Sequence, residues 1–415
     1  MTTAPPSSAA SHDSRVPVIP GITLLLCAIV AAVDLGGPIF YPGLGKIAAE
    51  FGVTPAQAQL AVTVNMIGAA ISQPFLGPVG DVFGRRRVLL VSLLALASLS
   101  LLAVVVTSFE ALIAVRAIQG FLGSAGIVLA RAIAHDMFPD QRRFTQVVSY
   151  LVITTGACSL VGPLMAGGLV GAYGWRAPLL FLGVFGIIVT IAAFFWFRRT
   201  SEARGGSGEG TNEWPGWKAL GGLLRNPRFY GSTALLSFSM APIFTVFGLS
   251  PMLLKSGASN APMQVAWLVS ILSCGFMAGA FLCSLRAATF GMVRTASLAI
   301  GIGFAIIAVM ILANGASLLT ILPGGMLVAL ASGYLNPVSL SLALQVDPRL
   351  VGTASGWSSA ISLALAAVGT QLATVMYTAN VAWLIAIGVG FTLLCWISIK
   401  PAMSGPAAPP TQPAG

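Results

Sequence analysis

Two charged side chains stand deep inside long apolar stretches of this sequence. Asp34 lies within residues 20–41 and is the only acidic residue deep in such a stretch, and Arg116 lies within residues 109–135. An ionisable group held in hydrocarbon is costly and is by default a candidate functional residue. A carboxyl group there could take a proton from one side of a membrane and release it to the other. We therefore predict that Asp34 couples to protons; a quiet pairing with an amide or an arginine is the alternative.

Arg116 belongs to the segment Arg116-Ala-Ile-Gln-Gly120. A helix that starts near Phe109 would carry this arginine about two turns into the apolar stretch. Its charge must then face a cavity or partners, and we predict a part in proton coupling. The competing explanation is that the long side chain extends back to the outer interface.

The segment Gly77-Pro-Val-Gly-Asp-Val-Phe-Gly-Arg-Arg-Arg87 is the most specific pattern in the chain. A carboxylate near a helix end can pair with arginines or with the dipole of a neighbouring helix, and could latch one face of the protein. Alternatively, the arginines mark only the cytoplasmic side. The predicted latch consists of Gly77, Asp81, Gly84, Arg85, Arg86 and Arg87.

Small residues and a proline gather in residues 145–171. Glycines let helices approach closely and prolines bend them, so a bend that moves or seals is one interpretation and plain helix packing is the other. The residues of the predicted bend are Gly156, Gly162, Pro163 and Gly167.

These residues lie on elements that the composition identifies as membrane helices. The chain of 415 residues is 57% hydrophobic and only 8% charged. Apolar runs of roughly 20 residues, enough to cross a bilayer, recur along it. The expected spans are 20–41, 57–78, 88–107, 109–135, 145–171, 177–198, 229–254, 262–286, 293–312, 317–345, 352–377 and 379–399. We therefore expect an all-α polytopic membrane protein of about twelve transmembrane helices.

The long polar break between Arg198 and Pro227 divides the spans into two sets of six. This arrangement is typical of transporters built from two six-helix halves. The expected organisation is a disordered N-terminus (1–19), an N-terminal half (20–198), a linker (199–228), a C-terminal half (229–399) and a disordered tail (400–415). Most of the 21 basic residues fall in segments on the side of the termini, so both termini should be cytoplasmic.

Several classes of protein are disfavoured by what the sequence contains. The five cysteines fall inside the spans, and His12 and His135 have no partners at ligand spacing, so no metal site is expected. The net charge of +10 follows membrane topology and does not indicate nucleic acid. A phosphate-binding Gly-x-x-x-x-Gly-Lys loop and a clustered catalytic set are both missing. We expect neither a cofactor nor an enzyme activity.

The motifs resemble those of the major facilitator superfamily over residues 20–399. The loop at 77–87 is similar to that family's signature loop, residues 116–120 to its arginine and glycine element, and residues 162–167 to the Gly-Pro-x-x-Gly-Gly element of its antiporters, with Ala166 replacing one glycine. Further stretches resemble the Bcr/CflA-type drug-resistance branch: 174–176, 249–252, 333–337 and 352–356. Asp34 departs from that pattern, because Pro38 occupies the usual acid position one turn later.

The resemblance implies a proton-coupled antiporter of the bacterial inner membrane that exports drugs or other small, largely apolar compounds. A carrier that takes up a sugar or an organic acid is the alternative. The implied partners are protons, a small molecule and the lipid bilayer, and a monomer is expected. The substrate cavity should lie at the midplane between the halves. Its candidate lining residues are Tyr41, Asn65, Gln73, Gln119, Phe244, Phe247, Asn336 and Gln371.

Overall fold

Every element in the described part of the chain is a helix. The computed structural model describes residues 20–138, 141–201, 225–254, 261–285, 290–344 and 351–403. The N-terminal group of helices is α1 (Pro20–Asp34), the 3-10 helix η1 (Pro38–Gly43), α2 (Leu44–Phe51), α3 (Pro55–Phe83), α4 (Arg85–Val105), α5 (Phe109–Gly123), α6 (Ala125–Met137), α7 (Gln141–Tyr173) and α8 (Arg176–Ser201). The C-terminal group is α10 (Pro227–Leu253), α11 (Ala261–Leu285), α12 (Phe290–Asn314), α13 (Leu318–Leu344), α14 (Val351–Ala379) and α15 (Trp383–Met403).

Eleven helical stretches in the described ranges are long and apolar enough to cross a membrane. The helix α3, with 29 residues, lies in the same bundle and supplies the remaining long helix. At about 1.5 Å per residue it exceeds the roughly 30 Å of a hydrocarbon core. The prediction of an all-α polytopic membrane protein is therefore confirmed.

The first membrane stretch, Gly21–Phe51, is interrupted where the sequence predicted one continuous helix. The helix α1 ends at Asp34, and the chain passes Gly36 and Gly37 before η1 begins at Pro38. Glycine is a poor helix former, and proline supplies no backbone N–H to the preceding turn. The interruption leaves backbone carbonyls available to other partners.

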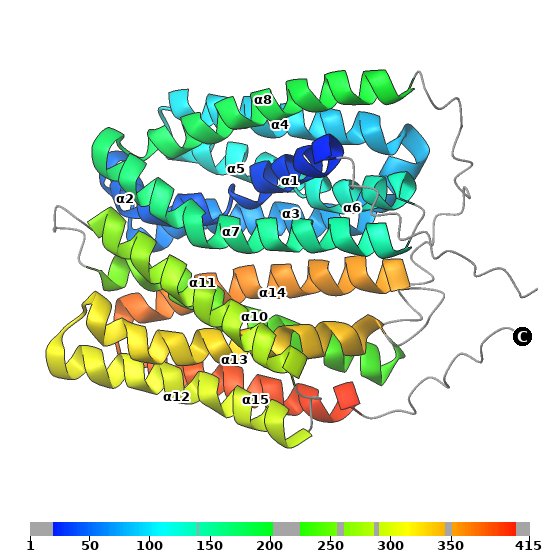
Figure 1. Cartoon of the computed structure of the whole chain (residues 1–415). Coiled ribbons are helices and arrows are strands. Elements are labelled where there is room, and N and C mark those ends of the chain that lie inside the picture. The colour runs from blue at the N-terminus through cyan, green and yellow to red at the C-terminus, as the bar shows by residue number, and fades with distance from the viewer. Residues whose placement is uncertain are drawn as a thin grey trace, which may run out of the picture.

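The helices form two groups that lie one above the other in Figure 1. Helices α1 to α8 pack mainly on one another, and α10 to α15 do the same. We call the end of the bundle where α1 begins and α15 ends the terminal end, and the end that carries α2 and the start of α3 the far end. Most contacts between the groups are those of α3 with α14 and α7 with α11, and η1 also contacts α10 and α11.

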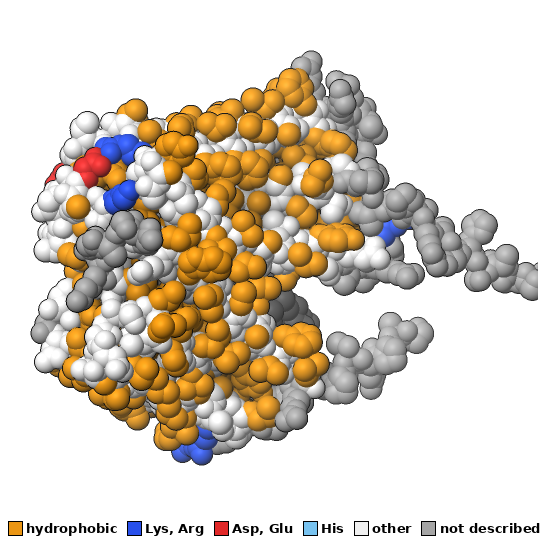
Figure 2. All heavy atoms as spheres, turned by 60° about the vertical axis from the view of Figure 1, so that its left-hand side comes forward, with side chains coloured by type: hydrophobic (Ala, Val, Ile, Leu, Met, Phe, Trp, Pro, Cys, Tyr) orange, Lys and Arg blue, Asp and Glu red, His pale blue; other side chains and the backbone are white. Residues whose placement is uncertain are grey.

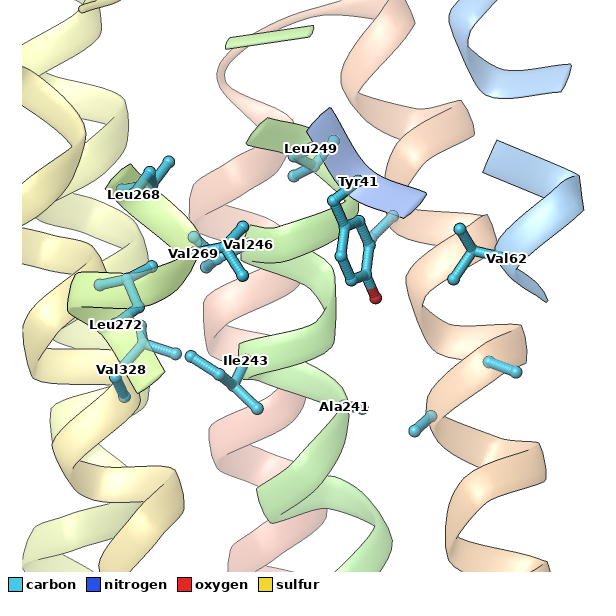
Figure 3. Packing of buried hydrophobic residues seen from close by; sticks show 14 of the residues in the cluster. Tyr41, Val62, Ala241, Ile243, Val246, Leu249, Leu268, Val269, Leu272 and Val328 are labelled. Atoms are coloured by element: carbon cyan, nitrogen blue, oxygen red, sulfur yellow. The ribbon is translucent and has the colours of Figure 1, made fainter. Parts of the chain in front are cut away.

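Apolar side chains cover most of the molecule's visible face, and charged side chains are confined to a few places (Figure 2). Such a face suits lipid, because hydrocarbon cannot solvate exposed polar groups. The largest buried cluster extends across both groups of helices. Figure 3 shows Tyr41 of η1 between Val62 of α3 and the turn of α10 that carries Val246 and Leu249.

Candidate functional site

Asp34 is the last residue of α1 and lies directly before the interruption. Its carboxylate is partly buried and accepts a hydrogen bond of 2.6 Å from the hydroxyl of Thr155 on α7. Arg131 of α6 lies within electrostatic range of the same carboxylate. The position of Asp34 thus ties the end of α1 to α7, the helix of the predicted bend.

Arg116 is 1% exposed and lies inside the N-terminal group of helices. Its guanidinium donates to the carbonyl oxygens of Ala61 at 3.2 Å and Gly36 at 3.3 Å, and to the Oε1 atom of Gln119 at 3.1 Å. The Phe40 ring covers the guanidinium at 4.4 Å. The side chain therefore turns into the protein, and an extension to the interface is not observed.

The acceptors around Arg116 are all neutral. Gln119 extends the hydrogen-bond network, because its amide group donates to the hydroxyl of Ser100 at 2.9 Å. Asn65 of α3 donates to the backbone carbonyl of Arg116 at 3.1 Å. The carbonyl of Gly36 belongs to the interruption between α1 and η1. Arg116 therefore uses its fixed fork of donors to join α3, α5 and the interrupted first stretch.

Two glycines allow this close approach of α3 and α5. A Cβ added at Gly120 would overlap the carbonyl oxygen of Asn65, and one added at Gly68 would overlap that of Ala117. No side chain can occupy either space without moving the backbone. The glycine of the segment 116–120 is thus a packing requirement of the arginine network.

The predicted bend residues lie on α7, which stays helical through Pro163. Added Cβ atoms would lie 2.5 Å from the Cβ of Ala266 at Gly167 and 2.9 Å from Met277 at Gly156, both on α11. At Gly162 the neighbour is Leu35, beside Asp34, at 2.9 Å. The glycines therefore let α7 contact both the interrupted first stretch and the C-terminal group.

The hydroxyl of Ser270 on α11 reinforces the same contact. It donates to the carbonyl of Leu160 on α7 at 2.7 Å, in the turn before Pro163. A proline weakens the backbone hydrogen bonds of the preceding turn, so a side-chain donor from a neighbouring helix can satisfy a carbonyl there.

The predicted latch lies at the junction of α3 and α4. Gly84 makes the turn with φ of +89°, a conformation that favours glycine. Arg85 forms a 2.7 Å ion pair with Asp136 of α6, and the Arg86 guanidinium lies 5.6 Å from the Phe197 ring centroid. Arg87 is exposed. The surroundings of Gly77 and the side chain of Asp81 lie outside what the structure describes, so the latch stays a prediction.

The aromatic candidates for the substrate cavity come together. The ring of Phe247 lies 5.7 Å from that of Tyr41 and 6.3 Å from that of Phe244, so η1 and α10 form one aromatic cluster, in which Tyr41 is buried. Asn336 of α13 is partly buried. Gln73 of α3 is also partly buried, and its Oε1 atom has no partner among the described residues.

The polar candidates Asn65, Gln119 and Gln371 are engaged in contacts between helices. Gln371 of α14 accepts from the Thr63 hydroxyl at 3.0 Å and donates to the carbonyl of Ala56 at 3.0 Å. These bonds join α14 to the far half of α3. The space-filling view in Figure 2 shows the two groups of helices meeting on the left and a hollow between them on the right.

Sequence reasoning did not single out Thr155, the partner of Asp34. Threonine is common in membrane helices, and nothing in its spacing marks it as the residue that reaches an acid 121 positions earlier. Its place directly before Gly156, in the helix of the predicted bend, was the available signal.

The fold agrees with the comparisons to known proteins. The family model of the Major Facilitator Superfamily matches residues 24–370. The chain belongs to this superfamily of membrane transporters. The predicted resemblance is thereby confirmed.

Three curated relatives are bacterial. An uncharacterized MFS-type transporter of Bacillus subtilis, YdgK, is 25% identical, with 86% of this chain and 90% of YdgK covered. The multidrug transporter MdfA of Yersinia pestis is 25% identical, with 85% and 86% covered. The bicyclomycin resistance protein homolog of Haemophilus influenzae is 29% identical, but only 40% of this chain and 42% of that protein are covered.

A solved structure supports the fold alone. The crystal structure of a mutant of the peptide transporter POT in complex with alafosfalin matches with a TM-score of 0.72. The match covers 92% of this chain and 94% of that one at 17% sequence identity.

Proposed function

We propose that this transporter exports drugs or other small, largely apolar compounds in exchange for protons. The observation that carries the proposal is the place of Asp34, a carboxylate inside a membrane stretch whose hydrogen-bond partner is a neutral hydroxyl. A carboxyl group with such a partner can exist in charged and neutral forms at modest cost. Arg116 keeps its proton and stays charged, so it cannot itself exchange a proton between the two sides.

The helix α7 connects the proton site to the contact between the halves. It carries Thr155, which holds Asp34, and Leu160 and Gly167, which contact α11. A shift of α7 against α11 would therefore change the surroundings of Asp34. Transport by alternating access needs such a link, because each ligand must bind differently to the two states.

The chemistry of the described cavity candidates suits neutral or lipophilic cationic substrates. Phe244 and Phe247 are partly buried beside the buried Tyr41 and offer aromatic faces, which bind apolar bodies and attract cations. Curated relatives with drug-related names include a multidrug transporter and a bicyclomycin resistance protein homolog. These names support export of antibiotics or similar compounds.

The arginine-rich terminal end should face the cytoplasm of a bacterial inner membrane. The hydrogen bonds of Gln371 then close the outer side, and the hollow in Figure 2 faces inward. On this assignment the structure represents an inward-open state. We also propose a latch at 77–87, two six-helix domains joined by a linker, and a monomeric state.

The proposal is tested by efflux of a lipophilic cationic dye from bacterial cells that express the chain. Cells that lack their own efflux pumps are loaded with dye, energised, and followed with and without a protonophore. We expect energised efflux that the protonophore abolishes. Efflux that continues at the same rate after the proton gradient has collapsed would contradict proton coupling.

Uptake of a sugar or an organic acid is the second candidate function. It would be favoured if the same cells accumulated such a solute on energisation and exported no dye. The amides of Asn65, Gln119 and Gln371 are already engaged in hydrogen bonds within the protein, which argues against it, because polar nutrients need several hydrogen-bond partners.

A further inference from the structure

A cavity of about 960 Å³ lies at the far end, between the two groups of helices. Its walls come from α2 and the start of α3 on one side, and from the ends of α10, α11 and α14 on the other. Its volume falls in the range of sites for drug-sized ligands. It is separate from Asp34, Arg116 and the aromatic cavity candidates, none of which line it.

The lining is apolar except at two places. Among the described residues, Lys46 of α2 is the only charged side chain that lines the cavity, and Tyr377 of α14 supplies a phenol from the other half. The remaining lining side chains are small or aliphatic. They include Val53, Pro251, Met252 and Val265.

The ammonium group of Lys46 uses only one of its three N–H donors within the described residues. Its ammonium group donates one hydrogen bond of 2.6 Å to the carbonyl of Val170 on α7. An ammonium group carries three N–H donors. A neutral carbonyl satisfies one donor and leaves the charge uncompensated.

The acid that would usually neutralise Lys46 is occupied elsewhere. Glu50 lies one turn further along α2, the spacing at which an ion pair forms on a helix surface. Its carboxylate instead forms a 2.6 Å ion pair with Arg176 and accepts a 2.7 Å hydrogen bond from Trp175. Lys46 thus has no carboxylate partner in the described part of the chain.

We infer that this cavity is a second ligand site, for an amphiphile with an anionic head and an apolar body. The head, a carboxylate or a phosphate, pairs with Lys46, and the body fills the aliphatic space between the halves. A charge-assisted hydrogen bond to an ammonium group is stronger than a neutral one, so the site discriminates by charge as well as by shape.

Such a ligand would act on the transport cycle. It contacts α2 and α3 in one half and α10, α11 and α14 in the other, so it binds best while the far end is closed. A ligand that binds one state better shifts the equilibrium toward that state. Occupancy should therefore slow transport without competing for the substrate site.

The test is equilibrium binding of radiolabelled dodecanoate to the full-length protein in nanodiscs of a zwitterionic lipid. We expect saturable binding that Lys46→Met weakens about tenfold or more and Lys46→Arg restores. Lys400→Met, which removes a charge at the terminal end, is the matched control and should leave the affinity unchanged. Ala49→Trp, which fills the cavity but keeps Lys46, should weaken binding as well.

The inference is overturned if Lys46→Met, with an unchanged melting temperature, binds dodecanoate as wild type does, or if uncharged dodecanol binds equally well. Nanodiscs that contain an anionic phospholipid identify the natural source of the head group. Loss of dodecanoate binding there shows that a lipid occupies the site, and retained binding shows a free amphiphile. The binding assay needs no proton gradient, so its result is independent of the proposed antiport.

Discussion

The two buried ionisable side chains have very different surroundings. Arg116 has three neutral acceptors and an aromatic cover, which compensate a permanent charge. Asp34 has a single hydroxyl donor and a more distant arginine, which leaves its protonation state open to change. Arg116 is thus a fixed cation that holds helices together, and we propose that Asp34 is the acid that exchanges a proton.

Replacing Thr155 by valine removes the hydrogen bond to Asp34 at nearly constant volume. A hydrogen bond to a carboxylate favours its charged form. The charged and polar groups near Asp34 that remain are Arg131 on α6 and Cys158 on α7. We expect the pH of half-maximal dye export to move by about one unit to the alkaline side, as loss of a charge-assisted hydrogen bond implies.

The measurement is the pH dependence of export in inverted vesicles. Thr155→Ser keeps the hydroxyl and is the matched variant that should retain the wild-type profile. An unchanged profile in Thr155→Val would show that this hydrogen bond has no part in coupling.

Arg116→Lys keeps the charge but loses the planar fork of donors. A lysine cannot reach the carbonyls of Ala61 and Gly36 and the amide of Gln119 together, so buried acceptors are left unpaired. We expect a loss of about 2 kcal/mol in the free energy of unfolding, measured as a lower melting temperature in detergent. Arg87→Lys, at an exposed position, is the control. Equal melting temperatures for both variants would refute the role of the neutral acceptors.

At the scale of the elements, the interruption of the first membrane stretch brings the site together. It ends α1 at Asp34, presents the carbonyl of Gly36 to Arg116 and places Leu35 against Gly162. The glycines on α5 and α7 then set how closely the neighbouring helices approach.

Gly120→Ala tests the approach of α3 and α5. The added Cβ would meet the carbonyl of Asn65, and overpacking a close helix contact costs about 1 to 3 kcal/mol. We expect a lower melting temperature and less protein in the membrane. Gly171→Ala on α7 is the control, because a Cβ there meets nothing within 4 Å. If Gly120→Ala proved as stable as Gly171→Ala, the close packing would not be a requirement.

The sequence predicted the elements well and their interruptions poorly. Apolar runs of membrane length predicted the helices, because a bilayer allows few other structures. They did not reveal that residues 20–41 break after Asp34, although Gly36, Gly37 and Pro38 carried the local signal. The length of an apolar run shows whether a segment can cross the bilayer, but it does not reveal a short break in the helix.

The site residues that could be predicted from the sequence are the charged side chains inside apolar stretches, because such side chains are rare there. An acid and an arginine deep in hydrocarbon stand out, and both make contacts with neighbouring helices in the structure. Thr155 could not be predicted as the partner of Asp34, because the packing of helices distant in sequence brings the two side chains together. The same holds for Asn65, Gln119 and Gln371, whose amides join helices in this structure.

At the scale of the whole molecule, transport by alternating access requires the far end to open during each cycle. The Thr63–Gln371 hydrogen bond joins the two groups of helices there, whereas the hydroxyls of Ser72 and Ser124 join two helices within the N-terminal group. Two pairs of positions therefore offer a matched comparison.

A cleavable cross-linker between cysteines at 63 and 371, in a protein without its native cysteines, should abolish export. Reduction of the linker should restore it. The same linker between cysteines at 72 and 124 should leave most of the activity. Full export by the protein cross-linked at 63 and 371 would show that the far end does not separate.

The central claim is that Asp34 carries the proton that drives export. The most direct measurement is dye accumulation by purified protein in vesicles with an imposed pH gradient, acid inside, for wild type, Asp34→Glu and Asp34→Asn. We expect gradient-driven accumulation by wild type and by Asp34→Glu. We expect none by Asp34→Asn, which should still exchange labelled for unlabelled dye without a gradient. Accumulation by Asp34→Asn at the wild-type level would contradict the claim.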